Sequence, residues 1–256
     1  MKMSNETKID EINSERRLGG VSRLYGDSAY DLLQRSHVVV IGVGGVGSWA
    51  AEALARNAIG EMTLIDFDHI SISNTNRQIH AVEGEYGKSK IQVMANRLLS
   101  INPEIKVNCI DDFLKPENFD MYLTKGMFLV DAMDDVATKI ALAAWCKKNK
   151  VPIVMSGGAG GKLDPNMATV TDLSKATHDP ILSKIRAALR KQHTFEKDPK
   201  KKMYLRVVYS AEPRQGISQG GLSCAGYGST VMVTATFGFL AAAEIVRQIL
   251  DLHKPV

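Results

Sequence analysis

The stretch HVVVIGVGGVG, residues 37–47, decides the fold class of this 256-residue chain. Residues 38–41 are apolar and β-branched, which is typical of a parallel strand buried on both faces. The glycines that follow fit the spacing GxGxxG, and residues 48–56 then have helical periodicity. A strand, a glycine-rich turn and a helix in this order form a unit that binds phosphate at the start of the helix.

The alternation of strands and helices continues along the chain. The sequence predicts strands over 61–65, 105–110, 127–130 and 151–155, with helices over 87–100 and 137–148. Further strands over 167–172 and 204–210 precede an apolar C-terminal helix. We therefore expect an α/β fold, a doubly wound and mostly parallel Rossmann-like sheet, with a C-terminal extension of strands and a buried helix.

The same reading divides the chain into three parts. Residues 1–36 form a helical segment interrupted at Gly19-Gly20 and at Gly26, and residues 37–165 form the nucleotide-binding core. Residues 166–256 complete the same domain. The apolar stretch 230–243 fits either a membrane span or a helix in the core or at a subunit interface. Charges at Glu244 and Arg247 favour the second interpretation, so no membrane span is expected.

Composition excludes several other classes of protein. With 45% hydrophobic and 23% charged residues, the chain is neither disordered nor fibrous. Its three cysteines, Cys109, Cys146 and Cys224, form no CxxC pair, which argues against a disulfide scaffold and a four-thiolate zinc site. No zinc is expected. The polar N-terminal segment carries both signs of charge, so we expect a cytoplasmic protein.

Positive charge is concentrated in one part of the chain, residues 184–206, which we call the basic segment. It holds nine of the 32 lysines and arginines, and only Glu196 and Asp198 oppose them. Such a segment is either a binding surface for a polyanion or a solvated helix face followed by a lysine-rich loop. The candidate polyanion-binding residues are Lys184, Arg186, Arg190, Lys191, Lys200, Lys201, Lys202 and Arg206.

GxGxxG alone does not distinguish ATP from NAD. Asp66 ends the second strand 19 residues beyond Gly47, where it can accept hydrogen bonds from ribose hydroxyls. Arg77, Lys90 and Asp134 also follow strand ends, and a triphosphate needs such cations and a carboxylate that binds Mg²⁺. ATP is therefore favoured. An NAD-dependent oxidoreductase and a non-catalytic nucleotide-binding scaffold stay open as alternatives.

These motifs together resemble the E1-like adenylating superfamily. The resemblance implies an ATP site, a ribose contact from Asp66, Mg²⁺ on Asp134, and formation of an acyl-adenylate with release of pyrophosphate. It implies that Arg77, Lys90 and Asp134 are catalytic. It also implies a homodimer in which Arg17, or alternatively Arg23, reaches the partner's site. The ATP-binding residues would be Gly42, Gly44, Gly45, Gly47, Asp66, Asp68, Asn74, Arg77, Gln78 and Lys90.

Three further segments, 19–26, 157–165 and 233–239, resemble one branch of that superfamily, the tRNA threonylcarbamoyladenosine dehydratases. Such enzymes use ATP to cyclise the threonylcarbamoyl group on the adenosine next to the tRNA anticodon, which would make tRNA the partner of the basic segment. The alternative is adenylation of a ubiquitin-like sulfur-carrier protein, whose activators typically bear CxxC pairs that this chain lacks.

Cys224 is the cysteine with two open interpretations. In the superfamily a cysteine can accept an acyl group or sulfur, which would imply a sulfur-transfer protein partner. Alternatively, Cys224 is a small buried residue at the start of the last helix. Cys109 in a strand and Cys146 in a helix are expected to be structural.

Overall fold

The computed structural model describes residues 14–214 and 227–252, and within them seven strands form one sheet. The strand order is β3-β2-β1-β4-β5-β7-β6, and every neighbouring pair is parallel except β6 with β7. The strands are β1 (His37–Ile41), β2 (Glu61–Ile65), β3 (Lys106–Ile110), β4 (Met127–Asp131), β5 (Ile153–Ser156), β6 (Ala168–Asp172) and β7 (Arg206–Ser210). The predicted doubly wound, mostly parallel sheet is confirmed.

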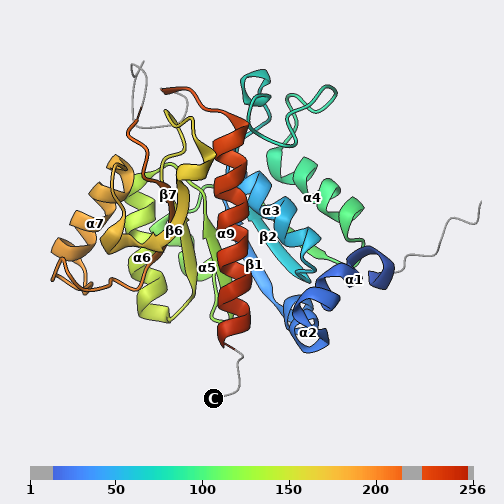
Figure 1. Ribbon diagram of the computed structural model, residues 1–256. Coiled ribbons are helices and arrows are strands. Elements are labelled where there is room, and N and C mark those ends of the chain that lie inside the picture. The colour runs from blue at the N-terminus through green and yellow to red at the C-terminus, as the bar shows by residue number, and fades with distance from the viewer. Residues whose placement is uncertain (1–13, 215–226, 253–256) are drawn as a thin grey trace, which may run out of the picture.

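Helices cover both faces of this sheet (Figure 1). The α-helices are α1 (Ser14–Tyr25), α2 (Asp27–Arg35), α3 (Gly47–Arg56), α4 (Lys90–Ile101), α5 (Phe119–Tyr122), α6 (Val136–Asn149), α7 (Pro180–Gln192) and α9 (Val231–Leu252). The 3₁₀ turns are η1 (Ile72–Asn74), η2 (Pro116–Asn118), η3 (Pro165–Met167) and η4 (Leu173–Lys175). Helices α3, α4 and α9 pack on one face, and α5, α6 and α7 pack on the other.

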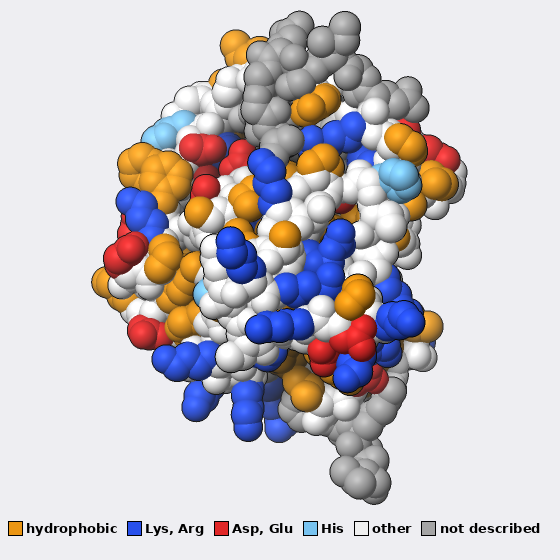
Figure 2. Space-filling model, turned by 90° about the vertical axis from the view of Figure 1, so that its left-hand side faces the viewer, with side chains coloured by type: hydrophobic (Ala, Val, Ile, Leu, Met, Phe, Trp, Pro, Cys, Tyr) orange, Lys and Arg blue, Asp and Glu red, His pale blue; other side chains and the backbone are white. Residues whose placement is uncertain are grey.

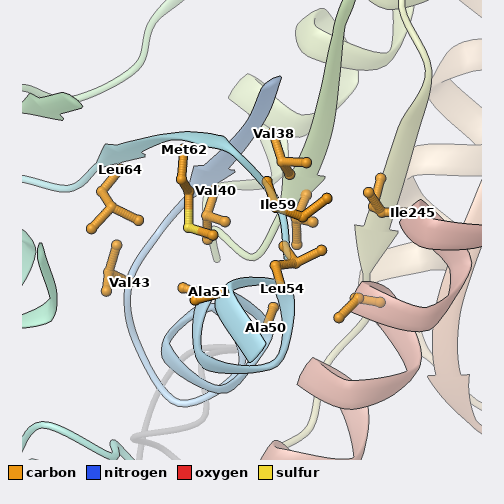
Figure 3. Close-up of a cluster of buried hydrophobic side chains, with 14 of the residues drawn as sticks. Val38, Val40, Val43, Ala50, Ala51, Leu54, Ile59, Met62, Leu64 and Ile245 are labelled. Atoms are coloured by element: carbon orange, nitrogen blue, oxygen red, sulfur yellow. The ribbon is translucent and has the colours of Figure 1, made fainter. Parts of the chain in front are cut away.

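The strands separate two apolar layers because successive side chains point to opposite faces. Val38 and Val40 of β1 face the α3 side, while Val39 and Ile41 face the α6 side. Figure 3 shows the first layer, in which Met62 and Leu64 of β2 lie over Ala50, Ala51 and Leu54 of α3, with Ile245 of α9 beside them. The central strands are therefore buried on both faces, as their uninterrupted apolar sequence predicts.

Helix α9 lies against α3 and along the sheet (Figure 1). At Gly238 a side chain would approach the carbonyl oxygen of Val46 to 2.6 Å, so only glycine allows this crossing. The helix is long and apolar enough to cross a membrane by length and composition, but 61% of its most apolar window is buried within the protein. The prediction of a buried C-terminal helix is confirmed.

Several element boundaries differ from the sequence prediction, most of them by one to three residues. Helix α4 begins at Lys90 rather than at residue 87, because Gly87 has a positive φ of 82° and Lys90 N–H donates to the carbonyl of Asp68. Helix α1 continues through Gly19-Gly20 and breaks only at Gly26. Strand β7 begins at Arg206 rather than 204, because Tyr204 has the left-handed φ of 56°.

Candidate nucleotide site

The glycine-rich loop folds tightly between β1 and the start of α3. Gly42 has a φ of 83°, and a side chain there would approach the carbonyl oxygen of Ala132 to 2.9 Å. A side chain at Gly47 would overlap the carbonyl oxygen of Gly42. Both glycines are thus required by close backbone approach. The result is a tight backbone turn at a helix N-terminus, partly accessible at Gly44 and Gly45, which is an anion-binding arrangement.

A cavity of about 520 Å³ lies over this loop, at the carboxyl ends of β1, β2, β4 and β5. Strand β1 sits between β2 and β4, where the strand order reverses and where open α/β sheets bind their ligands. The cavity brings together ten residues that the sequence singled out: Gly42, Gly44, Gly45, Asp66, Asp68, Asn74, Arg77, Gln78, Lys90 and Asp134. Gly47 does not line it and instead closes the turn beneath.

Asp66 is held at the end of β2 by two backbone N–H groups. Its Oδ2 accepts from Val43 at 2.6 Å, and its Oδ1 accepts from Asp68 at 2.9 Å. Burial raises the pKa of the Asp66 carboxyl, although the charge of Lys90 and these two hydrogen bonds oppose the shift. Each oxygen keeps a lone pair for a further donor, such as a ribose hydroxyl.

Three basic residues line the cavity, Arg77, Lys90 and Lys115, and the first two have side chains held by contacts within the protein. The Lys90 side chain is buried, and its Nζ lies 2.7 Å from Oδ2 of the exposed Asp68. Arg77 donates through Nη1 to the carbonyl of Ser73 at 2.7 Å and to Oδ1 of Asn76 at 3.0 Å. Phosphate oxygens in the cavity would therefore meet one ammonium and one guanidinium that are already in place.

Asn74 and Gln78 are both buried, but the side-chain oxygen of Asn74 is hydrogen-bonded within the protein and that of Gln78 is not bonded to any described residue. Asn74 ends η1, and its Oδ1 accepts from the backbone of Ser71 at 2.9 Å, so this atom stabilises the turn that carries Arg77. Gln78 Oε1 is buried and has no hydrogen-bond partner in the part of the chain that is described. An unpaired buried amide in a cavity wall is free to hydrogen-bond to a ligand.

Asp134 lies exposed on the loop between β4 and α6, at the edge of the cavity. Its neighbour Asp135 caps α6 by accepting from Thr138 N–H at 2.7 Å. Within residues 14–214 and 227–252, no three His, Cys, Asp or Glu side chains gather as a metal cage. A single carboxylate still fits Mg²⁺, which proteins usually hold by one or two carboxylates together with substrate phosphates and water.

The sequence reading missed a pair of aromatic side chains at the cavity. Phe67 and Phe113 line it with their ring centroids 5.0 Å apart, and both are about half exposed. Phe67 stands between the two aspartates that the reading emphasised, whereas Phe113 follows β3 with no motif to identify it. Exposed rings at a nucleotide cavity offer a surface on which a base can stack.

The remaining sequence-predicted residues lie outside the cavity. Arg17 is exposed on α1 and donates to the carbonyl of Ser100 at 3.4 Å. Cys224 falls outside the described residues. Arg23, the alternative to Arg17, also lies exposed on α1.

In the basic segment, not every side chain is free for a partner. Arg206 forms an ion pair with Glu244 at 2.7 Å, and Arg186 donates to the carbonyls of Leu173 and Ala176. Arg190 is half-buried. The exposed members are Lys197 and, among the candidate residues named above, Lys184, Lys191, Lys200, Lys201 and Lys202.

Together, the doubly wound sheet, the glycine loop and the cations around one cavity define a Rossmann-like protein that binds a nucleoside phosphate. The comparison with known families is more specific: the ThiF family matches residues 16–256, so the chain belongs to the ThiF family.

Two similar proteins carry the same name. The chain is 46% identical over 247 residues to a tRNA threonylcarbamoyladenosine dehydratase of Haemophilus influenzae, covering 93% of this chain and 95% of that one. It also resembles the crystal structure of E. coli tRNA N6-threonylcarbamoyladenosine dehydratase, TcdA, in complex with ATP. There the TM-score is 0.86 and the identity 44%, over 93% of this chain and 95% of that chain. The resemblance to this branch of the superfamily is confirmed.

The alternative branch is more distant. A molybdopterin-synthase adenylyltransferase of Haemophilus influenzae is 31% identical over 165 residues, covering 61% of this chain and 68% of that protein. This ranking agrees with the sequence reading, which placed the carrier-protein activators second.

Proposed function

We propose that this protein is an ATP-dependent adenylating enzyme that dehydrates N6-threonylcarbamoyladenosine in the anticodon loop of tRNA. The observation that carries the proposal is one cavity that joins the glycine loop at a helix N-terminus, the cations Arg77 and Lys90, and the carboxylate of Asp134. The names of the similar proteins support the substrate. An NAD site would leave these three charged side chains without a role.

The chemistry begins with a carboxylate, which is a poor electrophile because oxide would have to leave. Attack of the threonyl carboxylate oxygen on the α-phosphorus of ATP forms a P–O bond, breaks the bond to the β-phosphate and releases pyrophosphate. The ureido oxygen then attacks the activated carbonyl, the C–O bond to AMP breaks, and the ureido nitrogen in the ring loses its proton to solvent. One carboxylate oxygen therefore leaves with AMP, and a five-membered ring closes with the advantage of an intramolecular reaction.

The chain's own residues stabilise charge during these steps. Arg77, Lys90 and the backbone N–H groups at the start of α3 face the phosphates, where negative charge builds up on the leaving pyrophosphate. Lys90 contacts Asp68 at 2.7 Å, so the phosphates would share or replace this partner. Asp66 would hold the ribose. No nucleophile from the protein is needed, because the substrate provides its own.

We include Mg²⁺ in the proposal, held by Asp134 and the phosphates. A divalent cation at this position would neutralise phosphate charge. Asp134 and Asp135 are exposed carboxylates of the β4–α6 loop that line the cavity, and Asp135 caps α6, which leaves Asp134 as the carboxylate for Mg²⁺.

The proposal is tested by nucleoside mass spectrometry of threonylcarbamoyladenosine-bearing tRNA after incubation with the protein, Mg²⁺ and ATP. We expect an ATP-dependent loss of one water from the modified adenosine. Lys90→Ala should slow the reaction by about 10²–10³-fold, since it removes a charge-stabilising donor. Asp134→Asn should raise the Mg²⁺ concentration needed for ATP binding. Glu83→Gln, at an exposed carboxylate outside the cavity, is the matched control.

The alternative function has a different signature in the same assay. If the nucleoside is unchanged and ATP–pyrophosphate exchange appears only when a ubiquitin-like carrier protein is added, the chain activates a protein carboxyl terminus. That result would leave the proposed ATP site intact, but the proposal that tRNA is the substrate would be wrong.

We propose a homodimer with Arg17 reaching the partner's site. Two observations support an interface on the exposed side of α9: Met232 and Phe239 are 63% and 47% exposed, and Phe239 packs edge-to-face on Trp49. Light scattering should give twice the monomer mass. A monomer at assay concentration would contradict the proposal.

The exposed lysines of the basic segment are the proposed tRNA contacts, together with the half-buried Arg190. Arg186 and Arg206 remain in the proposed set, although Arg186 donates to two backbone carbonyls and Arg206 forms an ion pair with Glu244. A sulfur-transfer partner, a role for Cys224 and the cytoplasmic location stay predictions of the sequence.

A further inference from the structure

A second cavity, of about 360 Å³, lies at the start of α7 and is distinct from the nucleotide cavity. Two arginines, Arg186 and Arg214, line it together with His178 and Ser183. Gly158 forms the wall between the two cavities: it lines the nucleotide cavity, and a side chain there would overlap the Nη2 atom of Arg214. Arg214 of the second cavity therefore lies directly against a residue that lines the nucleotide cavity.

The wall of this cavity contains one carboxylate, but it is already satisfied. Asp179 caps α7 by accepting from Leu182 N–H at 3.0 Å, and its other oxygen accepts from Gly158 N–H at 2.8 Å. The ion pairs found within the described chain include neither Arg186 nor Arg214. The cavity thus presents two guanidinium groups with no contacting counter-charge from the described residues.

Arg214 has unused hydrogen-bonding capacity. Its Nε and Nη1 atoms are buried and find no partner in residues 14–214 or 227–252, while its guanidinium lies 4.8 Å from the ring centre of Tyr227. A buried donor without a partner is rare in proteins and costs stability. The arrangement is explained if an anion completes it.

Arg186 adds to the positive field. Its Nη1 is fixed by the carbonyls of Leu173 and Ala176 at 3.1 and 2.7 Å. Burial lowers the pKa of this guanidinium, the charge of Arg190, one helical turn further along α7, lowers it further, and the carboxylate of Asp179 opposes the shift. Positive groups are crowded here, so an incoming anion would be stabilised by several of them at once.

We propose that this cavity binds a backbone phosphate of the substrate RNA next to the modified adenosine, with Arg214 as its principal ligand. The inference rests on the proposed function and adds to it the place where the RNA backbone is fixed. The cavity belongs to α7, whose exposed lysines start the basic segment, and Figure 2, from that side, shows lysine and arginine spread over the face. Guanidinium groups bind phosphate in a bidentate geometry.

The competing anion is the threonyl carboxylate of the substrate itself. A binding experiment separates the two sources, using anticodon stem-loop RNAs with and without the threonylcarbamoyl group and no ATP. If Arg214 binds a phosphate, Arg214→Ala reduces the affinity of the protein for both RNAs equally, by about tenfold. It also lowers the slope of log affinity against log salt concentration by about one. A loss confined to the modified RNA would assign Arg214 to the carboxylate and overturn the proposal.

Arg35→Ala is the matched control, because Arg35 is an exposed arginine on α2, on the opposite side of the molecule from α7 (Figure 1). It should leave RNA affinity unchanged. Arg214→Lys keeps the charge but not the planar pair of donors, so an intermediate loss is expected. Protection of each variant by ATP against thermal unfolding verifies that the fold and nucleotide site are intact. An RNA affinity of Arg214→Ala equal to that of wild type would also overturn the proposal.

Single neutral methylphosphonates along the anticodon loop then locate the phosphate. At one position the methylphosphonate should reduce the affinity of the wild-type protein for RNA about tenfold. The same substitution should leave the affinity of Arg214→Ala unchanged, since that variant has already lost the contact. If no position behaves so, the cavity binds no backbone phosphate. These measurements need no turnover. If the protein binds RNA through Arg214 but leaves the nucleoside unchanged, the phosphate site is supported and the proposed dehydratase activity is wrong. If the protein dehydrates the nucleoside but its RNA affinity does not depend on Arg214, only the phosphate site is wrong.

Discussion

Two loops that line the nucleotide cavity are each held by a fully buried lysine, and the two lysines are satisfied in different ways. Behind the loop that carries Asp134, Lys139 Nζ lies 2.9 Å from Asp131 Oδ1 and also donates to the carbonyl of Met133 at 3.1 Å. Behind the loop that carries Gly158, Lys162 Nζ donates to three backbone carbonyls, those of His178, Ser210 and Glu212.

The difference concerns charge. Lys139 and Asp131 are 0% exposed and form an ion pair, so this loop is fixed without adding net charge near Asp134, the proposed Mg²⁺ ligand. Lys162 is 1% exposed, and the carboxylates of Asp179 and Glu212 act on it only at longer range. Behind the β4 loop the charge of Lys139 is therefore balanced by direct contact with a carboxylate. At the β5 end burial lowers the pKa of Lys162, and the charges of Asp179 and Glu212 oppose this shift without forming an ion pair with it.

Removing the paired lysine should have the largest effect. Lys139→Met leaves the Asp131 carboxylate buried without a counter-charge, so the free energy of unfolding should fall by roughly 3–5 kcal/mol. Denaturant unfolding at neutral pH measures this loss. The double variant Asp131→Asn with Lys139→Met should recover much of the stability, since no buried charge remains. A double variant as unstable as the single one would show that packing, not charge, is responsible.

His80 is a third buried basic side chain, 2% exposed, and its ring nitrogens hydrogen-bond neither to a carboxylate nor to a backbone carbonyl among the described residues. Burial, with the charges of Lys90 and Arg97, lowers its pKa to about 4. The unfolded chain, with a pKa near 6.5, binds the proton first as the pH falls, so the contribution of His80 to stability is lost between pH 6.5 and 4.

The expected loss is about 1.4 kcal/mol for each pH unit in that window, and about 3 kcal/mol in all. Unfolding curves at several pH values measure it. His80→Leu should flatten the dependence relative to wild type. An unchanged slope would mean that His80 accepts the proton while the protein stays folded.

Of the two lysine substitutions, removal of the carbonyl-bound Lys162 should lower the free energy of unfolding less. Lys162→Met removes a buried charge together with its desolvation cost, but it leaves buried carbonyls unpaired, so we expect a loss of about 1–3 kcal/mol. The same denaturation experiment ranks it against Lys139→Met. A greater loss than for Lys139→Met would reverse the comparison and show that the carbonyl cage, rather than the ion pair, is the main stabilising element at the cavity.

Much of the candidate site could be predicted from sequence because its residues follow strand ends. Gly42, Asp66 and Asp134 follow β1, β2 and β4, and parallel strands bring their carboxyl ends to one edge of the sheet. The second cavity could not be predicted in this way. Arg214 follows β7 and Arg186 lies in α7, so their meeting depends on how those elements pack against Gly158.

The sequence by itself determined the parallel sheet, the glycine loop and a set of charged residues that line one cavity. It could do so because strand periodicity and glycine spacing are local properties, which the chain fixes over a few residues. Only the tertiary structure decided which charges are satisfied: that Asp131 neutralises Lys139, that Arg206 is paired with Glu244, and that Arg214 keeps unpaired donors. Burial and pairing depend on groups far apart in the chain, and the electrostatic energy of a side chain is set by those neighbours rather than by its place in a motif.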